Sequence, residues 1–167
     1  MRCLCCGKEI LSSASTLEKD WCWHKKCVKN FFHTKEMPIL DITEEQIEKL
    51  ANETVNEGLT IPGVQKKLSL HLSSDTNARL TIVNYPTGYI LKPQTDEFKN
   101  MPEFEDLAMR MAEMLGIQTV PHALIKMNGE YAYITKRIDR EITEREVRLY
   151  AMEDFCQLSH RLTQDKY

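Results

Sequence analysis

The first 27 residues carry a metal-ligand pattern that limits how this part of the chain can fold. Cys3 and Cys6 are separated by two residues, and His24 and Cys27 repeat that spacing. Each pair has the short spacing that lets two ligands share one tetrahedral ion. A segment this small cannot bury an adequate core, so metal binding would supply most of its folding free energy. The sequence therefore predicts a structural Zn²⁺ site in a small zinc-ribbon-like module over residues 1–36.

Two other interpretations of these cysteines stay open. The thiols can be unliganded, or Cys5 or Cys22 can have a redox or catalytic role, because both are surplus to one four-coordinate ion. Cys156 lies far from the others among apolar neighbours, and we predict that it is a core residue.

Composition places the chain among ordinary globular proteins. Its 167 residues suit one domain with a small appendage, and 42% of them are hydrophobic and 28% charged. No apolar run approaches the roughly 20 residues that a membrane span needs, and the N-terminus lacks a signal-peptide core. We therefore expect a cytoplasmic protein without membrane contact, whose cysteines are thiols or metal ligands rather than disulfides.

Charge is distributed unevenly along the chain. The formal net charge is −3, which is not typical of a nucleic-acid-binding surface. The first 35 residues, however, contain seven basic and three acidic residues. This local excess indicates either a site for an acidic partner or a solvated face.

The region after the cysteine module predicts one helix followed by strands. Thr43 and Gln46 have the spacing of a capping box, which indicates a linker helix within residues 37–58. Alternating apolar residues predict strands over residues 68–72, 80–83 and 89–92, for which an antiparallel meander is the economical arrangement.

The second half of the chain predicts a helix, a hairpin and a final helix. The helix begins at Pro102 or Glu103 and ends at Gly116. Asn128 and Gly129 are the strongest short signal for a hairpin. The region around residues 152–158 suits a last helix. The helix that ends at Gly116 has an apolar stripe of the kind that packs on a core. This stripe consists of Leu107, Ala108, Met111, Ala112, Met114 and Leu115.

Three residue types then occur in an order that suits phosphate binding. Gly63 lies in a turn before a strand, Lys92 ends a later strand, and Glu105 follows on a helix. A glycine turn lets backbone amides approach a phosphate, a lysine neutralises its charge, and a glutamate can hold that lysine extended. Each feature alone is usually a plain turn, an exposed lysine or a surface glutamate. Their order predicts the small lobe of a kinase, an α+β fold with an antiparallel sheet and flanking helices.

Five ordered motifs over roughly residues 58–167 resemble the HipA family of serine/threonine-protein kinases, the toxins of bacterial type II toxin–antitoxin systems. The resemblance implies a HipA-like kinase N-terminal lobe over residues 59–167. The segments that carry it are the Gly-x-Gln-x-Lys loop at residues 63–67, the lysine strand at 89–93, the Glu105 helix, the segment 136–140, and the Glu-Asp-x-x-Gln segment at 153–157.

The resemblance also implies individual roles. Lys92 would contact the phosphates of ATP and pair with Glu105, and these two are the candidate catalytic residues. Thr60 lies where the family carries a regulatory phosphorylated serine. The residues implied to bind ATP are Gly63, Val64, Gln65, Lys67, Lys92, Lys136, Ile138 and Asp139.

Two departures from the family shape the expected activity. Ile138 replaces a phenylalanine next to the adenine. The catalytic Asp and the residues that hold Mg²⁺ belong to a larger second lobe that this sequence does not contain, so we expect the chain alone to be inactive. It is interpreted either as a fragment of a longer kinase or as a natural split or degenerate small lobe.

The expected function is ATP binding in a HipA-like kinase that phosphorylates a serine or threonine of a protein substrate. A HipB-like antitoxin or a companion subunit is a possible partner, and DNA would be met only through an antitoxin. The alternative is a zinc-ribbon binding module that holds an antitoxin, a companion subunit or DNA without catalysis. A structural fragment without separable activity is the third interpretation.

Overall fold

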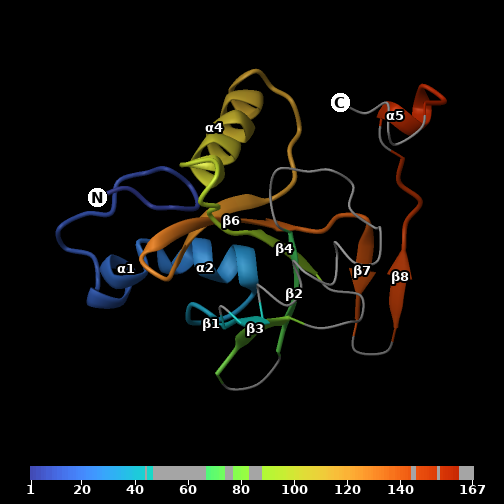
Figure 1. Ribbon diagram of the computed structural model, residues 1–167. Coiled ribbons are helices and arrows are strands. Elements are labelled where there is room, and N and C mark those ends of the chain that lie inside the picture. The colour runs from blue at the N-terminus through green and yellow to red at the C-terminus, as the bar shows by residue number, and fades with distance from the viewer. Residues whose placement is uncertain are drawn as a thin grey trace.

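The computed structural model describes residues 1–43, 45–46, 67–73, 77–82, 88–143, 146–153 and 155–161. These residues form an α+β fold around a six-stranded sheet (Figure 1). Its strands, in spatial order, are β1 (Ile39–Asp41), β3 (Arg79–Ile82), β2 (Leu68–Leu72), β4 (Tyr89–Lys92), β6 (Glu130–Lys136) and β5 (His122–Met127).

The sheet is mixed, and its order differs from the predicted meander. β1 pairs with β3 in parallel, whereas the remaining pairs are antiparallel. A meander would place β3 between β2 and β4, but β1 occupies the outer edge of β3 and β4 pairs with β2 instead. The meander prediction was therefore wrong in strand order, because the short strand β1 was not recognised.

The hairpin between β5 and β6 is confirmed. Asn128 has a φ of 51° and Gly129 a φ of 85°, which are the left-handed conformations that a tight two-residue turn requires. The turn fixes the register in which Ala123 faces Ile134 and Ile125 faces Ala132. Alternation along the two strands then gives each face of the sheet its own set of side chains.

One face of the sheet shares a hydrophobic core with the N-terminal segment. Helices α1 (Thr16–Trp21) and α2 (Lys25–Phe32) lie against this face (Figure 1). The Trp23 indole N–H donates to the Leu124 carbonyl at 3.1 Å, and the Tyr89 hydroxyl donates to the Phe31 carbonyl at 3.2 Å. The shared core contains Cys3, Ile10, Trp23, Val28, Phe31 and Phe32 together with Leu68, Leu70, Leu80, Tyr89, Leu91, Ala123, Ile125, Met127, Ala132 and Ile134.

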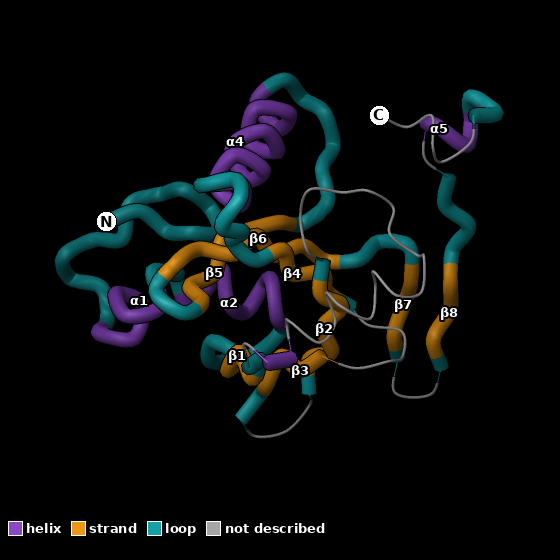
Figure 2. The backbone as a smooth tube through the Cα atoms, in the orientation of Figure 1, coloured by secondary structure: helices purple, strands orange, loops and turns teal. Residues whose placement is uncertain are grey.

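Helix α4 (Met101–Met114) lies across the other face of the sheet (Figure 2). Its buried side is polar at Asp106, and most of its large apolar side chains are exposed. Asp106 is buried with 6% exposure, whereas Met114 is 87% exposed. The predicted apolar stripe was therefore wrong as a core-facing surface: Leu107, Met111 and Leu115 are also exposed. The reason is that this face of the sheet carries polar groups, including Lys92 and His122, which α4 meets with carboxylates.

The remaining elements lie at the end of the sheet away from α1 (Figure 1). β7 (Arg140–Ile142) and β8 (Val147–Leu149) form an antiparallel pair, and α5 (Phe155–Leu158) follows. Cys156 is only partly buried, on a helix whose other side chains are exposed, so its assignment to the core was wrong.

Two other expectations concern residues next to gaps in the described ranges. The Thr43 capping box is confirmed, because Thr43 N–H donates to Gln46 Oε1 at 2.9 Å and Gln46 N–H donates to Thr43 Oγ1 at 3.2 Å. The rest of the predicted linker helix and Val83 lie outside the described residues. In the described part of the chain, no helix has the length and apolar character needed to cross a membrane.

Candidate nucleotide site and metal cluster

Lys92 at the end of β4 forms an ion pair with Glu105 on α4. Both side chains are largely shielded, with 19% and 27% exposure. The Lys92 ammonium also lies 5.5 Å from the centre of the Tyr133 ring on β6. Burial and the nearby carboxylates of Glu105 and Asp106 raise the pKa of Tyr133, so this phenol stays neutral. The Lys92 ammonium is thus held beside the Tyr133 ring by its ion pair with Glu105.

Strand alternation places Lys92 on the face of the sheet that α4 covers. Tyr89 and Leu91 point into the shared core, so Ile90 and Lys92 point toward α4. The pairing of Lys92 with Tyr133 across β4 and β6 sets the neighbouring ring directly beside it. The position of the ammonium thus follows from the register of two strands and one helix.

A second polar network lies next to this pair and was missed in the sequence. Asp106 accepts a hydrogen bond from Arg110 Nε at 2.6 Å and lies 2.9 Å from His122 Nδ1. The other ring nitrogen, His122 Nε2, lies 3.3 Å from Glu113. Burial alone would raise the pKa of Asp106, but the hydrogen bonds from His122 and Arg110 hold it below its ordinary value. Only the four-residue spacing of Asp106 and Arg110 could have indicated part of this network.

The segment after β6 is fixed by a doubly paired carboxylate. Asp139 accepts two hydrogen bonds from Arg137 and two from Arg140, at 2.6 to 3.2 Å. The hydrogen bonds from Arg137 and from Arg140 hold the pKa of Asp139 well below its usual range. This pairing fixes the path of the chain as it leaves β6. Contact of Asp139 with a nucleotide stays a prediction.

The residues implied to surround adenine lie along the same segment. Lys136 N–H donates to the Pro121 carbonyl and Arg137 N–H donates to the Gly88 carbonyl, both at 2.9 Å. The Lys136 ammonium lies 2.9 Å from His33 Nε2, on the face of the sheet opposite to Lys92. Ile138 is 61% exposed. The side chains of Lys92 and Lys136 are therefore not brought together.

Of the predicted phosphate loop at residues 63–67, the structure describes only Lys67. Thr60, Gly63, Val64 and Gln65 lie outside the described residues, and Lys67 is exposed just before β2. Convergence of the glycine turn and Lys92 on one phosphate group remains a prediction.

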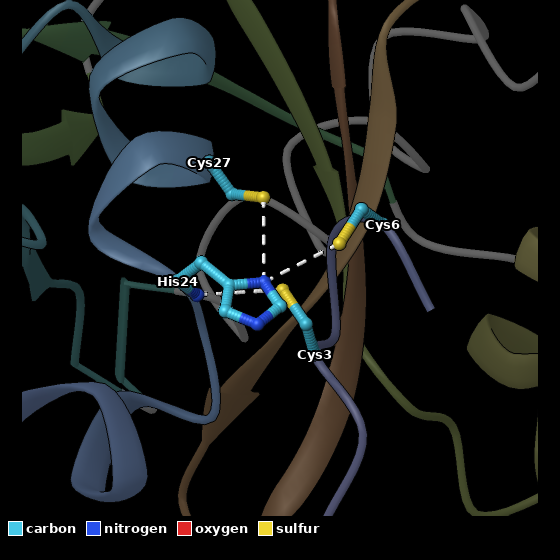
Figure 3. A group of neighbouring side chains, drawn as sticks. All are labelled: Cys3, Cys6, His24 and Cys27. Carbon is cyan, nitrogen blue, oxygen red and sulfur yellow. Dashed lines mark hydrogen bonds between the residues drawn. The ribbon is translucent and has the colours of Figure 1, made fainter. Parts of the chain in front are cut away.

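Four side chains of the N-terminal segment form a compact metal-ligand cluster (Figure 3). One ligand atom from each of Cys3, Cys6, His24 and Cys27 lies within 4.8 Å of the others. His24 Nδ1 lies 3.4 Å from Cys6 Sγ and 3.9 Å from Cys27 Sγ. The predicted ligand set is thus brought together in space.

The surroundings of the cluster fit a structural Zn²⁺ ion. His24 Nε2 lies 3.2 Å from the Glu9 carbonyl, which leaves Nδ1 directed at the thiols, as in metal-bound histidines. His24 N–H donates to Cys3 Sγ at 3.4 Å. Burial and the neighbouring thiols of Cys5 and Cys3 raise the pKa of Cys27, because crowded thiolates without a cation are unfavourable. A divalent cation would balance them, and three sulfurs with one imidazole are a typical closed zinc set.

The two surplus cysteines lie outside this set. Burial raises the pKa of Cys5 to about 12, and the neighbouring thiol of Cys3 adds to that effect. Cys22 is buried, and its thiol donates to the Lys19 carbonyl at 3.4 Å. A raised thiol pKa at Cys5 and a buried thiol at Cys22 are features of unreactive structural cysteines.

The fold and the Lys92–Glu105 pair place the chain in one class of protein. It is an α+β domain in which a lysine on a strand is held by a glutamate on a helix. Residues 59–167 match the family described as "HipA-like C-terminal domain". This match covers more than half of the chain, and the chain therefore belongs to the HipA-like family.

Two curated relatives are named as kinases. The chain is similar to the protein named "Putative kinase" of Haemophilus influenzae, with 31% identity over 90 residues, which is 51% of this chain and 25% of that protein. It is also similar to "Putative kinase Y4mE" of Sinorhizobium fredii, with 32% identity over 100 residues, 59% of this chain and 24% of that protein. The matched regions thus span about a quarter of the length of these relatives.

Proposed function

We propose that this chain is the ATP-binding small lobe of a HipA-like serine/threonine-protein kinase. The observation that supports this proposal best is the ion pair between Lys92 and Glu105 within the family-matched segment. A lysine on a strand that is paired with a helix glutamate is the arrangement by which protein kinases bind ATP phosphates.

Each described residue has a definite part in this proposal. Lys92 neutralises phosphate charge, and Glu105 keeps its ammonium on the sheet face beside Tyr133. Asp139 holds Arg137 and Arg140 and so fixes the segment that borders the adenine. The Gly63 turn would supply backbone amides, and phosphorylation of Thr60 would add about −1.5 to −2 charge beside them.

Phosphoryl transfer requires more than this lobe. Positioning and charge stabilisation by both lobes with Mg²⁺ account for most of the rate enhancement in such reactions. We therefore propose that transfer from ATP to a protein serine or threonine occurs when the lobe is joined to a catalytic lobe. The small lobe alone should bind the nucleotide weakly, because it forms only one side of the binding cleft.

The metal cluster has a structural part in the proposal. Cys3, Cys6, His24 and Cys27 would hold Zn²⁺, which supplies a fixed tetrahedral crosslink and no open position for chemistry. Because the segment shares its core with the sheet, the crosslink stabilises the lobe as a whole.

Calorimetric titration with ATP tests the proposal. Replacing Lys92 with Met should weaken ATP binding by at least about tenfold, which corresponds to roughly 1.4 kcal/mol. The control is Lys126→Met, since Lys126 is a lysine on β5 that donates to the Asp20 carbonyl. Equal affinities for the two variants would contradict the role of Lys92.

The binding-module alternative makes a different prediction. DNA affinity that depends on phosphate contacts falls steeply with salt, because bound counterions are released. Tight, salt-sensitive DNA binding without ATP binding would favour that alternative. We propose an antitoxin or a companion subunit as the protein partner in either case.

A further inference from the structure

Arg110 connects α4 to the backbone turn that carries two of the metal ligands. Its Nε donates to Asp106 at 2.6 Å within α4. Its Nη2 donates to the Leu4 carbonyl at 3.3 Å and to the Cys5 carbonyl at 3.1 Å. Both carbonyls belong to residues between the ligands Cys3 and Cys6. One guanidinium thus joins the metal-ligand turn to the helix.

The turn is shaped so that Arg110 can approach it closely. Gly7 has a φ of +69°, and a Cβ added there would lie 3.0 Å from Arg110 Nη1. Gly7 N–H donates to the Cys3 carbonyl at 2.9 Å, which closes the turn around the cluster. Leu4 is fixed further by hydrogen bonds with Cys22 and Leu124. In this conformation of the turn, both carbonyls accept hydrogen bonds from Arg110 Nη2.

Within α4, Arg110 holds Asp106, the residue next to Glu105 of the candidate nucleotide site. Asp106, which Arg110 holds, directly follows Glu105, the partner of Lys92. Consecutive helix residues point about 100° apart, so fixing the direction of Asp106 fixes that of Glu105. His122 on β5 holds the other oxygen of Asp106 at 2.9 Å. The rotation of α4 about its axis is thereby set by a strand and by the metal-ligand turn.

We propose that Arg110 is a positioning residue that couples metal binding at Cys3, Cys6, His24 and Cys27 to the Lys92–Glu105 pair. When the four ligands share one ion, the Leu4 and Cys5 carbonyls are held in place for Arg110. Arg110 then keeps Glu105 turned toward Lys92. The inference deepens the proposed function and rests on it for the nucleotide-binding consequence.

Two measurable consequences follow. Removing the metal should loosen α4 and weaken nucleotide binding. Because coupling between two sites is reciprocal, nucleotide should strengthen metal binding by the same factor. Such factors are typically about 5 to 150.

The experiment compares the whole chain with and without Zn²⁺, for the unchanged sequence and for Arg110→Met. Amide hydrogen exchange of residues 101–114 and ATP affinity are measured in each state. In the unchanged chain, zinc loading should slow exchange in α4 and tighten ATP binding, each by about fivefold or more. In Arg110→Met, zinc should still bind through its four ligands, but both effects should be lost. The control is Arg148→Met on β8, which removes an arginine that lies over Tyr150 and should keep both effects.

The outcomes separate this inference from the proposed function. If no form binds ATP, the proposed function is wrong, and the exchange of α4 alone decides whether Arg110 couples the two regions. Exchange that does not respond to zinc in the unchanged chain, or that responds equally in Arg110→Met, would overturn the inference. If Arg110→Met does not fold, Arg110→Lys serves instead. It keeps the charge but cannot reach Asp106 and both carbonyls together, so zinc should have a reduced effect, and a full effect would overturn the inference.

Discussion

Lys92 and Glu105 form an ion pair between the end of β4 and the second turn of α4, with both side chains mostly shielded from solvent. The sequence places these residues 13 positions apart, and a loop and the start of a helix separate them. Their contact therefore depends on α4 lying across the sheet in one rotation.

Replacing Glu105 with Gln should leave the fold intact but weaken ATP binding. The Lys92–Glu105 pair is shielded but still reached by solvent, with 19% and 27% exposure, so its net contribution to stability is about 1 kcal/mol or less. The same change frees the Lys92 ammonium from its fixed position and so disorders the candidate phosphate contact. Urea unfolding should show a shift within about 1 kcal/mol, while calorimetry shows a loss of ATP affinity of several-fold or more. If Glu105→Gln instead unfolds much of the protein while the folded molecules keep their ATP affinity, the role assigned to Glu105 is wrong.

Replacing Asp106 with Ala should destabilise the chain strongly. The change leaves Arg110 and His122 without the carboxylate that they share. Removing one partner of a buried charged network costs about 3 kcal/mol or more. The matched control is Asp41→Ala, because the ion pair of Asp41 with Arg79 is about half exposed and should cost no more than about 1 kcal/mol. Urea denaturation measures both, and equal losses would show that the Asp106 network is not structural.

Acid should reduce stability in part through Asp139. Hydrogen bonds from Arg137 and Arg140 place its folded-state pKa below the unfolded value of about 3.9. A carboxylate with a depressed pKa contributes stability that is complete above the unfolded pKa and is lost as pH falls toward the folded pKa. Asp139→Asn should therefore have a flatter stability profile between about pH 5 and pH 2 than the unchanged chain. Parallel profiles measured by urea unfolding would contradict this role.

Metal content should depend on Cys27 and not on Cys156. Cys27→Ser removes one of the four clustered ligands, so zinc measured by elemental analysis should fall from one ion per chain to a small fraction. The loss should also lower the melting temperature of the whole lobe, because the cluster shares its core with the sheet. Cys156→Ser should keep the full zinc content. Retention of zinc by Cys27→Ser would mean that another cysteine, such as Cys5, completes the site.

The sequence predicted local features better than their arrangement. The hairpin at Asn128 and Gly129 followed from residues that accept positive φ, and the cluster of Cys3 and His24 followed from ligand spacing. These are short-range constraints that do not depend on the rest of the fold. Strand order was not predictable, because pairing of β1 with β3 joins residues about 40 positions apart without a sequence signal.

The orientation of α4 could not be predicted for a related reason. Its apolar periodicity indicated a core-facing stripe, yet Leu107 and Met111 face outward. The polar contacts of Asp106 and Arg110 with distant residues outweigh that pattern. Nor did the sequence show that Trp23 would reach the Leu124 carbonyl and join the N-terminal segment to the sheet. Long-range polar contacts leave little trace in a single sequence.

Covalent labelling with an acyl-phosphate derivative of ATP tests the central claim most directly. Such a reagent acylates a lysine amine that lies at its phosphates and releases the nucleotide, and mass spectrometry of peptides then locates the label. We predict that Lys92 is the principal labelled lysine and that excess ATP suppresses its labelling. Labelling that leaves Lys92 unmodified, or that ATP does not suppress, would contradict the account.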